Sequence, residues 1–452
     1  MSRNNPSQSE QAMLSELGRY VIADPKPFVV DVGRSRGMWL ATVGGRRLFD
    51  WAGYYGSKLI GHNHPRLYEP AYVERLIRAA NNKVANPDFL TVECLDYYRL
   101  IHDMAPRCMR SPNLEVYAVN SGAEAVENMM KYLINLHLQK HAVERRPNIR
   151  RRFICFDQAF HGRTVFALGV TGLSADPIVT RDYHGFADDN IRVPFPAIDT
   201  DADPAVNRKR TETALGRVED ALRRDAHGIV AIIVEPIQGA GGHRTAETEF
   251  FRGLSVLAHR YGVYLGLDEV QTAGGQTGSF FAVDQFDLPY PPQAIAAAKK
   301  LACGVVYMLQ PMEDRGVLDS TWGGHLADMV RFVQEMAIVR DERLIESISE
   351  KTDLLLHTLR CMASKHHDLI SNIRGMGLYQ GFSLRGSDTA GTLAAIALEH
   401  EDLLLLKAGP DTIRLRPVLD VSNDDIAEFG HRLDRSLCRL RTMRDGAGDN
   451  RS

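Results

Sequence analysis

Four short motifs in the middle of the chain carry side chains that can do chemistry on a small molecule. They are NSGAEAVE at 120–127, FHGRT at 160–164, LDEVQ at 267–271 and AAAKK at 296–300. Each lies at the end of an apolar run of strand type, and ligands in doubly wound sheets bind where the parallel strands end. One motif alone indicates little, because serine and glycine start many ordinary helices and most lysines are exposed.

Together, the four motifs predict a site for pyridoxal 5′-phosphate. Small residues at a helix N-terminus can offer backbone N–H groups to a phosphate. Here these residues are Ser121, Gly122 and Ala123. Asp268 can keep a pyridine nitrogen protonated, and Lys299 can form a Schiff base with an aldehyde. Phe160 and His161 can lie against a flat ring, although His161 equally suits a histidine that is satisfied at a turn.

The same motifs resemble those of the class III, or ω-, aminotransferases, a family of fold-type I pyridoxal-phosphate enzymes. The resemblance rests on NSGAEAVENMMK, AFHGRT, EPIQG, DEVQTAGGQTG and AAAKKLACG, and it extends over roughly residues 28–440. Within the family, HGRT, Ser320–Arg331 and Asp411–Ser422 resemble the branch that acts on the ε-amino group of lysine. The family implies a cytoplasmic homodimer whose active sites are shared across the two subunits.

The resemblance also implies a role for each motif residue. Lys299 would bind the cofactor and carry the catalytic proton, with Lys300 its rival by adjacency, and Asp268 would pair with the ring nitrogen. Glu235 would orient its neighbours at a strand end. The other cofactor contacts would be Phe160 and Val270 on the ring faces, Gln271 at the ring hydroxyl, Ser121, Gly122, Ala123 and His161, and, from the second subunit, Thr321 at the phosphate.

Two arginines match positions that hold substrate carboxylates in the lysine and 4-aminobutyrate branches of the family. They are Arg163 and Arg414. The planar fork of arginine suits this role because it binds a carboxylate through two parallel hydrogen bonds. Arg416 would lie on the same face of its strand as Arg414 and stays a candidate. The alternative for either Arg163 or Arg414 is a salt bridge at a domain junction.

Three positions depart from the family pattern. Relatives read EPIQGEGG, and their second glutamate covers the deep arginine, whereas this chain has Ala240 there. Because an unpaired charge in a closed site is costly, either another group pairs with Arg414 or every substrate brings a carboxylate. Asp319 replaces an asparagine of the lysine branch beside Thr321, where an acid would repel a phosphate. Lys58 then either contacts substrate or neutralises Asp319 across the dimer, unless it is an ordinary surface lysine.

The expected reaction moves an amino group from a small-molecule donor, with the ε-amino group of L-lysine as the first choice. The acceptor would be a keto acid such as 2-oxoglutarate, and the cofactor would pass through its pyridoxamine form. An alternative is a class III aminotransferase that acts on another, possibly cyclic, keto acid in a biosynthetic pathway. Further alternatives on the same fold are an aminomutase, an epimerase, a decarboxylase and a non-catalytic binding protein.

Apolar runs of strand type must position these residues. The runs cover 114–120, 152–157, 228–236, 263–270 and 294–298. They lack alternation, which indicates strands buried on both faces, and the intervening segments are long enough for crossover helices. We therefore expect an α/β fold of the fold-type I class, with a large domain built on a mostly parallel sheet and a smaller α+β C-terminal domain. The spacing at 122–140 predicts the helix that would follow the phosphate site.

The C-terminal part has a different pattern. Residues 327–365 predict one long helix, and 377–384, 402–409 and 411–419 predict short strands, the last two joined by a Gly-Pro-Asp turn. We expect an N-terminal segment at 1–60 that packs with the small domain, a large domain at 61–328 and a small domain at 329–452. The strand pair within 37–51 belongs to the first of these, and residues 445–452 should be disordered.

Composition limits the partners. The formal net charge of −3 gives no basic field for nucleic acid, and no apolar run approaches the roughly 20 residues that span a bilayer. The six cysteines are scattered without zinc spacing and fit reduced thiols in the cytoplasm. The start of the chain is polar and has no apolar signal core. These features favour a soluble cytoplasmic enzyme with small-molecule substrates.

Overall fold

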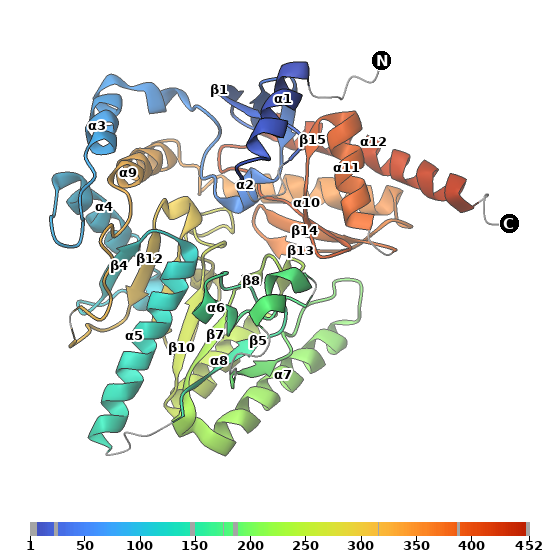
Figure 1. The fold of residues 1–452 in the computed structure, drawn as a ribbon. Coiled ribbons are helices and arrows are strands. Elements are labelled where there is room, and N and C mark those ends of the chain that lie inside the picture. The colour runs from blue at the N-terminus through green and yellow to red at the C-terminus, as the bar shows by residue number, and fades with distance from the viewer. Residues whose placement is uncertain are drawn as a thin grey trace.

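The computed structural model describes residues 7–21, 26–144, 150–174, 176–183, 189–314, 316–386 and 389–448. Figure 1 shows a large sheet with helices on both faces, and a second group of helices and short sheets built from the two ends of the chain. None of the helices in the described ranges is both long and apolar enough to cross a membrane. All six cysteines are free thiols.

The large sheet has seven strands in the order β4-β12-β11-β10-β7-β5-β6. Their bounds are β4 (Glu115–Val119), β5 (Arg152–Phe156), β6 (Ile191–Val193), β7 (Ile229–Val234), β10 (Tyr264–Asp268), β11 (Ala294–Ala297) and β12 (Gly304–Met308). β12 runs in the opposite direction to the other six strands, because it pairs antiparallel with both β11 and β4. The prediction of a mostly parallel sheet that is buried on both faces is confirmed.

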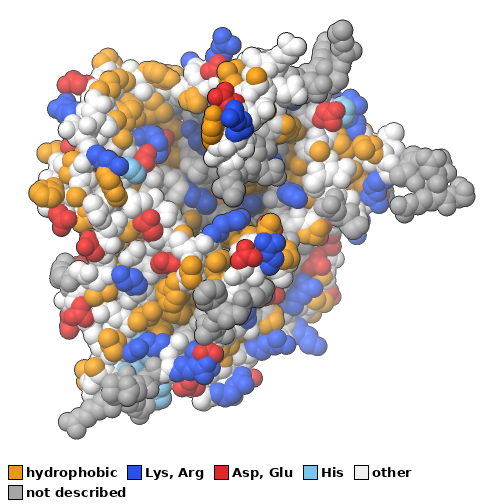
Figure 2. All heavy atoms as spheres, viewed as in Figure 1, with side chains coloured by type: hydrophobic (Ala, Val, Ile, Leu, Met, Phe, Trp, Pro, Cys, Tyr) orange, Lys and Arg blue, Asp and Glu red, His pale blue; other side chains and the backbone are white. Residues whose placement is uncertain are grey.

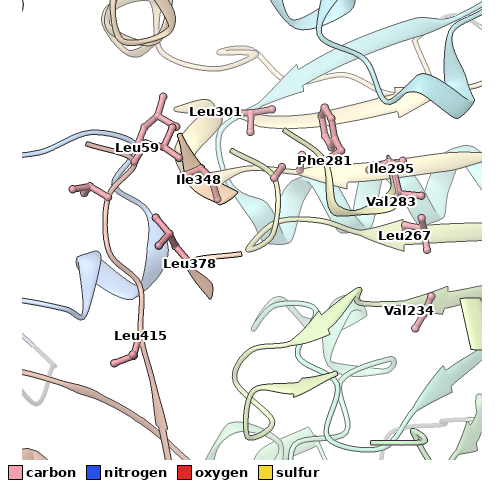
Figure 3. Packing of buried hydrophobic residues seen from close by; sticks show 14 of the residues in the cluster. Leu59, Val234, Leu267, Phe281, Val283, Ile295, Leu301, Ile348, Leu378 and Leu415 are labelled. Atoms are coloured by element: carbon pink, nitrogen blue, oxygen red, sulfur yellow. The ribbon is translucent and has the colours of Figure 1, made fainter. Parts of the chain in front are cut away.

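Helices cover both faces of this sheet because its strands are apolar on both sides. On one face α5 (Gly122–Val143) packs against Val230, Ile233 and Ala296. On the other face lie α4 (Val92–Asp103), α8 (Thr248–Tyr261) and α9 (Leu326–Asp341). Figure 3 shows side chains from three neighbouring strands of this face in one row: Val234, Leu267 and Ile295. Burial of such side chains stabilises the layers by about 2 kcal/mol each.

The small sheets join the two ends of the chain. β13 (Ile370–Met376), β14 (Tyr379–Leu384), β17 (Thr412–Arg414) and β16 (Leu406–Ala408) form one sheet. β1 (Val30–Arg36), β2 (Trp39–Thr42), β3 (Arg47–Asp50) and β15 (Leu403–Leu404) form another. β15 lies parallel to β3, so the N-terminal strands share a sheet with a C-terminal strand. This pairing supports the expected packing of the N-terminal segment, while the boundaries at residues 60 and 328 stay a prediction.

The structure has further helices and strands. They are α1 (Gln8–Leu17), α2 (Gly53–Gly56), α3 (Pro70–Asn81), α6 (Val165–Leu168), α7 (Pro204–Asp225), α10 (Ile348–Lys365), α11 (Thr389–Glu401), α12 (Asn423–Gly448), β8 (Ile237–Gln238) and β9 (Arg244–Thr245). The 3-10 helices are η1 (Pro65–Tyr68), η2 (Arg107–Met109), η3 (Pro177–Val179), η4 (Arg181–Tyr183), η5 (Ala226–Gly228), η6 (Ala282–Gln285) and η7 (Lys299–Leu301).

One prediction for the C-terminal part is wrong. The expected single helix at 327–365 is divided into α9 and α10. The chain reverses at Arg343, whose φ of 53° is left-handed, and this lets Leu344 pack in the core. α12 extends to Gly448, and the expected disorder of residues 445–452 stays a prediction. Residues 449–452 lie outside the described residues.

Candidate active site

The carboxyl edge of the large sheet brings residues from three strands together. Phe160 and His161 follow β5, Glu235 follows β7, and Asp268 ends β10. Nδ1 of His161 lies 2.7 Å from Oδ2 of Asp268, and the backbone N–H of Phe160 donates to Oε1 of Glu235 at 2.9 Å. The two contacts join loops far apart in sequence, so the FHGRT and LDEVQ motifs meet at one edge.

Asp268 is buried and held by two donors. Its Oδ1 accepts the backbone N–H of Val270 at 2.9 Å, and its Oδ2 faces the ring of His161. An ionised carboxylate only accepts hydrogen bonds, so the Nδ1 of His161 carries the proton. His161 is therefore a hydrogen-bonded histidine that positions Asp268, a contact that the sequence did not predict. Its Nε2 is buried without a partner among the described residues.

The start of α5 lies directly against the loop after β10. A β-carbon at Gly122 would lie 2.7 Å from Cγ1 of Val270, so only glycine permits this approach. Ser121 caps the helix, because its Oγ accepts the backbone N–H of Glu124 at 3.2 Å. The first N–H groups of a helix have no carbonyl partner in it. The backbone N–H groups of Gly122 and Ala123 thus suit an anion.

The two adjacent lysines face different surroundings. Nζ of Lys300 is buried and donates to the carbonyl of Gln271 at 2.6 Å, to Oη of Tyr379 at 2.7 Å and to the carbonyl of Gly56 at 3.1 Å. Nζ of Lys299 has no hydrogen-bond partner in the described part of the chain. Burial lowers the pKa of Lys299, and the positive charge of Arg414 lowers it further. The structure therefore makes Lys300 a structural residue and leaves the amine of Lys299 available.

Arg414 and Arg416 both lie buried beside these lysines, but their guanidinium groups differ. The guanidinium of Arg416 lies 4.2 Å from the ring of Tyr379 and contacts Nδ1 of His243 at 3.0 Å. Nε and Nη1 of Arg414 are buried without a partner in the described residues. Burial, followed by the charge of Arg416, lowers the pKa of Arg414 to about 9. Arg414 has more free donors for a carboxylate than Arg416.

Lys299, Lys300, Arg414 and Arg416 form a cationic cluster, and His243 contacts the guanidinium of Arg416 in it. Its Nε2 lies 3.1 Å from the carbonyl of Tyr379, so Nε2 donates and Nδ1 accepts the hydrogen bond from Arg416. Burial lowers the pKa of His243 well below its usual range, and the charge of Arg416 acts in the same direction. A neutral His243 therefore fixes Arg416 in place. Figure 2 shows Lys and Arg side chains in the hollow between the upper and lower parts of the molecule.

The glycine-rich loop after β7 is a packing element. A β-carbon at Gly239 would lie 2.1 Å from Oε1 of Gln271, and one at Gly241 would lie 2.1 Å from the carbonyl of Gln158. Arg374 of β13 donates to the carbonyl of Gly242 at 2.5 Å and to that of His243 at 2.9 Å. The loop is thus fastened between the large sheet and the β13–β14 sheet.

Three other residues named in the sequence analysis are exposed in this chain. Arg163 is exposed, with its guanidinium 6.0 Å from the ring of Phe160. Thr321 and Asp319 are exposed, and Ser320 between them accepts a hydrogen bond from the side chain of Asn120 at 3.2 Å. The substrate role of Arg163 and the phosphate role of Thr321 stay predictions.

Lys58 is only partly exposed. Burial lowers its pKa, and the carboxylate of Glu335 is the largest opposing influence. Asp420 and Asp50 raise the pKa in the same way. The structure therefore gives Lys58 acidic neighbours within its own chain. Its proposed contacts with substrate or across a dimer stay predictions.

A strained turn borders the cationic cluster and was not predicted. Gly53, Tyr54, Tyr55 and Gly56 all have left-handed φ angles, between 47° and 78°. Such a conformation costs roughly 1–2 kcal/mol for a non-glycine residue. Oδ1 of Asp50 accepts hydrogen bonds from the backbone N–H groups of Ala52 and Gly53, and these bonds fix the start of the turn. The paired glycines around two tyrosines were the sequence signal for this turn.

Glu269 is a second buried acid at the end of β10. Its carboxylate accepts hydrogen bonds from Thr272 Oγ1 at 2.6 Å, from the backbone N–H of Ala282 at 2.9 Å and from that of Val283 at 2.8 Å. Burial nevertheless raises its pKa to about 7. The folded protein therefore binds a proton at the carboxyl of Glu269 more tightly than the unfolded chain does.

We expect Glu269→Gln to change how stability depends on pH. A carboxyl with a raised folded pKa stabilises the protein at low pH, and this contribution is lost as the pH rises from the unfolded value toward about 7. The loss is about 3 kcal/mol for Glu269 and should be absent in the glutamine variant. Urea unfolding of both proteins at pH 5 and pH 8 measures it. A difference between the two proteins that does not vary with pH would contradict the prediction.

Comparisons with known proteins identify the family of this chain. A family model described as aminotransferase class III matches residues 20–437. The chain belongs to the class III aminotransferases. This aminotransferase is 31% identical to the L-lysine-epsilon aminotransferase of Amycolatopsis lactamdurans over 436 residues, which cover 93% of the chain and 94% of the relative. It is 32% identical to that of Mycobacterium tuberculosis, over 91% of the chain and 92% of the relative.

A solved structure agrees with the relatives found by sequence. The lysine aminotransferase from M. tuberculosis in its internal aldimine form superposes with a TM-score of 0.88 at 29% identity, over 95% of this chain and 99% of that one. The fold-type I architecture is thus confirmed. As a class III aminotransferase, the enzyme is a transaminase that depends on pyridoxal 5′-phosphate.

The residues at the sheet edge fit this cofactor. Asp268 offers a buried carboxylate for the ring nitrogen, and Lys299 offers a free amine. Oε1 of Gln271 is buried without a partner in the described residues, as expected for a group that awaits the ring hydroxyl. Gly122 leaves the helix N-terminus open beside Val270. These observations support the predicted cofactor contacts, which are assigned here as a proposal.

Proposed function

We propose that this aminotransferase moves the ε-amino group of L-lysine to a keto acid such as 2-oxoglutarate. The observation that carries the proposal is the buried guanidinium of Arg414, which has two unpartnered nitrogen atoms beside the amine of Lys299. A keto acid with two carboxylates would satisfy it. The relatives named L-lysine-epsilon aminotransferase support the choice of lysine as donor.

Each residue of the site then has a distinct task. Pyridoxal phosphate, when bound, supplies an aldehyde that takes up the amino group and a ring that withdraws electrons from the adjacent C–H bond. Asp268, oriented by His161, would hold a proton on the ring nitrogen. The N-terminus of α5 would bind the phosphate through backbone N–H groups. Val270 and Phe160 would enclose the ring and exclude water from it.

Lys299 would move the proton. A lysine acts as a base only when its amine is neutral, and burial together with the charge of Arg414 lowers the pKa of Lys299 in that direction. Lys300 adds no acid–base function, because its amine is already bound to Gly56, Gln271 and Tyr379. Arg414 and Arg163 would hold the two ends of a dicarboxylate, so that the reacting carbon lies over the cofactor.

A second candidate follows from Ala240. No carboxylate forms an ion pair with Arg414 in the described residues, and Ala240 offers none from the loop. A lysine that binds through its ε-amine would leave the guanidinium of Arg414 without a charge partner. A substrate with a carboxylate near the reacting carbon would form an ion pair with it. The second candidate is therefore an enzyme that uses carboxylate-bearing substrates in both half-reactions, with a different and possibly cyclic keto acid as the physiological acceptor.

Single half-reactions separate the two candidates. The cofactor-loaded enzyme is mixed with lysine, ornithine, 4-aminobutyrate or glutamate, and the loss of its visible absorption band is followed. The lysine proposal predicts a fast loss with lysine that 2-oxoglutarate reverses. If glutamate reacts while lysine, ornithine and 4-aminobutyrate do not, the proposal for lysine is wrong and the second candidate stands.

We also propose that the enzyme is a cytoplasmic homodimer. Several apolar side chains are exposed at 89–95, among them Phe89, Leu90 and Val92 at 69%, 77% and 68%. An exposed apolar group of this kind marks a contact surface, and a second copy of the chain would cover it. Light scattering of the purified enzyme tests this, since a dimer has twice the 50.5 kDa of one chain. The free thiols support the cytoplasm as compartment.

A further inference from the structure

A cluster of imidazole and carboxylate groups lies at the C-terminal end of α5, opposite the end that faces the cofactor site. His141 and Glu144 belong to the last turn and cap of α5, and His227 belongs to η5, directly before β7. One ligand atom of each residue lies within 4.8 Å of the others. α5 has 22 residues, so this cluster is about 33 Å from the N-terminus of the helix.

The contact between His141 and Glu144 is an ion pair only when His141 is protonated, and its geometry does not suit a hydrogen bond. Oε2 of Glu144 is 3.0 Å from Nδ1 of His141, yet Nδ1 has no hydrogen bond of acceptable geometry to any described residue. His141 is only 3% exposed, so this nitrogen is also shielded from water. A buried polar atom without a partner is unfavourable by about 1–3 kcal/mol. A cation shared between the imidazole and the carboxylate would satisfy both.

His137 holds the cluster in place. Its ring packs on that of His141, with the ring centres 4.2 Å apart, and its Nε2 lies 2.9 Å from the backbone carbonyl of His227. The contact fixes the η5 turn, and with it His227, against α5. Metal-binding groups with a fixed orientation lose less freedom when the ion binds.

The charge of the helix end favours a cation at this place. The C-terminus of an α-helix carries a partial negative charge and Glu144 adds a full one, while the positive charge of Lys140 opposes them. Two imidazoles and one carboxylate are ligands that Zn²⁺, Co²⁺ and Ni²⁺ prefer, and one position of a tetrahedral ion stays free for water. Figure 2 shows histidine side chains at the surface at the lower left, near the lower end of α5 in Figure 1.

We propose that His141, Glu144 and His227 form a binding site for a divalent transition-metal ion that fastens the C-terminal end of α5 to the turn before β7. The ion would join two elements of the large sheet layer and would not take part in amino transfer. The site is accessible, because Glu144 and His227 are exposed. Small side-chain rotations bring the ligand atoms from their present separation to metal–ligand distances of about 2 Å.

Isothermal titration of the cofactor-loaded enzyme with Zn²⁺, and separately with Ni²⁺, tests the site. We expect one bound ion per chain and an increase in the thermal midpoint on binding. His227→Ala should weaken the binding at least tenfold and abolish the increase. Because His227 is exposed, this variant should fold normally, and its amino transfer without metal should equal that of the wild type.

Two further variants test whether the ion binds at this cluster and not at another group of possible ligands. Glu144→Gln should also weaken binding, because it removes the negative ligand. Cys438→Ser should not, although Cys438 lies near His366 and Asp434 in another group of possible ligands. The proposal is overturned if the wild type binds no ion at 100-fold excess, if His227→Ala binds as tightly as the wild type, or if Cys438→Ser removes the binding.

Discussion

Lys299→Ala is expected to fold normally and to lose amino transfer by at least about a thousand-fold. The amine at this position is the one free amine at the sheet edge among the described residues, and it would both bind the cofactor and move the proton. Either function alone contributes about 10²–10⁴ in rate. The turnover number at saturating substrate measures the loss. The visible absorption band of the lysine-bound cofactor should disappear in the same variant.

Lys300→Met is the matched control, because it removes the adjacent amine. That amine binds two carbonyl groups and Oη of Tyr379 in a fully buried place, so its loss leaves buried acceptors without a donor. We expect the free energy of unfolding to fall by about 2 kcal/mol, while the absorption band remains. If Lys300→Met loses the band and Lys299→Ala keeps it, the assignment of the two lysines is reversed.

Arg414→Met is expected to raise KM for 2-oxoglutarate about 100-fold or more. Two charge-assisted hydrogen bonds to a carboxylate contribute roughly 3 kcal/mol, and each 1.4 kcal/mol corresponds to a factor of ten. The same substitution should leave the empty enzyme no less stable, because it removes a buried guanidinium whose pKa the protein lowers to about 9. Steady-state kinetics and urea unfolding measure the two effects.

Arg414→Lys separates charge from geometry. Lysine keeps the positive charge but lacks the planar fork, so KM should lie between the values of the wild type and the methionine variant. An amino donor without a carboxylate should lose little in either variant. A KM for 2-oxoglutarate that stays unchanged in Arg414→Met would assign the carboxylate to another residue, and Arg416 is then the nearest alternative.

The positions of the motifs at the sheet edge could be predicted from the sequence because they follow from local patterns. Buried apolar runs identify the strands, and the ends of parallel strands meet. The helix after Ser121 follows from its spacing and its cap. The break between α9 and α10 could not be predicted in this way, because neither glycine nor proline marks the turn at Arg343.

The contacts that hold the site depend on pairs far apart in sequence. His161 and Asp268 are separated by 107 positions, and His243 and Arg416 by 173. A single sequence shows the chemical type of each residue but not which partner it meets. For the same reason Arg414 and Arg416 could not be distinguished by alternation along a strand. Their difference arises from Tyr379 and His243, which directly contact the guanidinium of Arg416.

The parallel pairing of β15 with β3 has a consequence for the order in which the enzyme folds. Leu403 aligns with Phe49, so more than 350 residues must be made before the last strand of this sheet exists. Closure of such a long loop is entropically unfavourable and slow, and contacts of this kind lower folding rates. During synthesis, β3 emerges early with one edge unpaired, and an open strand edge promotes association with other chains. This edge of β3 therefore stays open until residue 404 has left the ribosome.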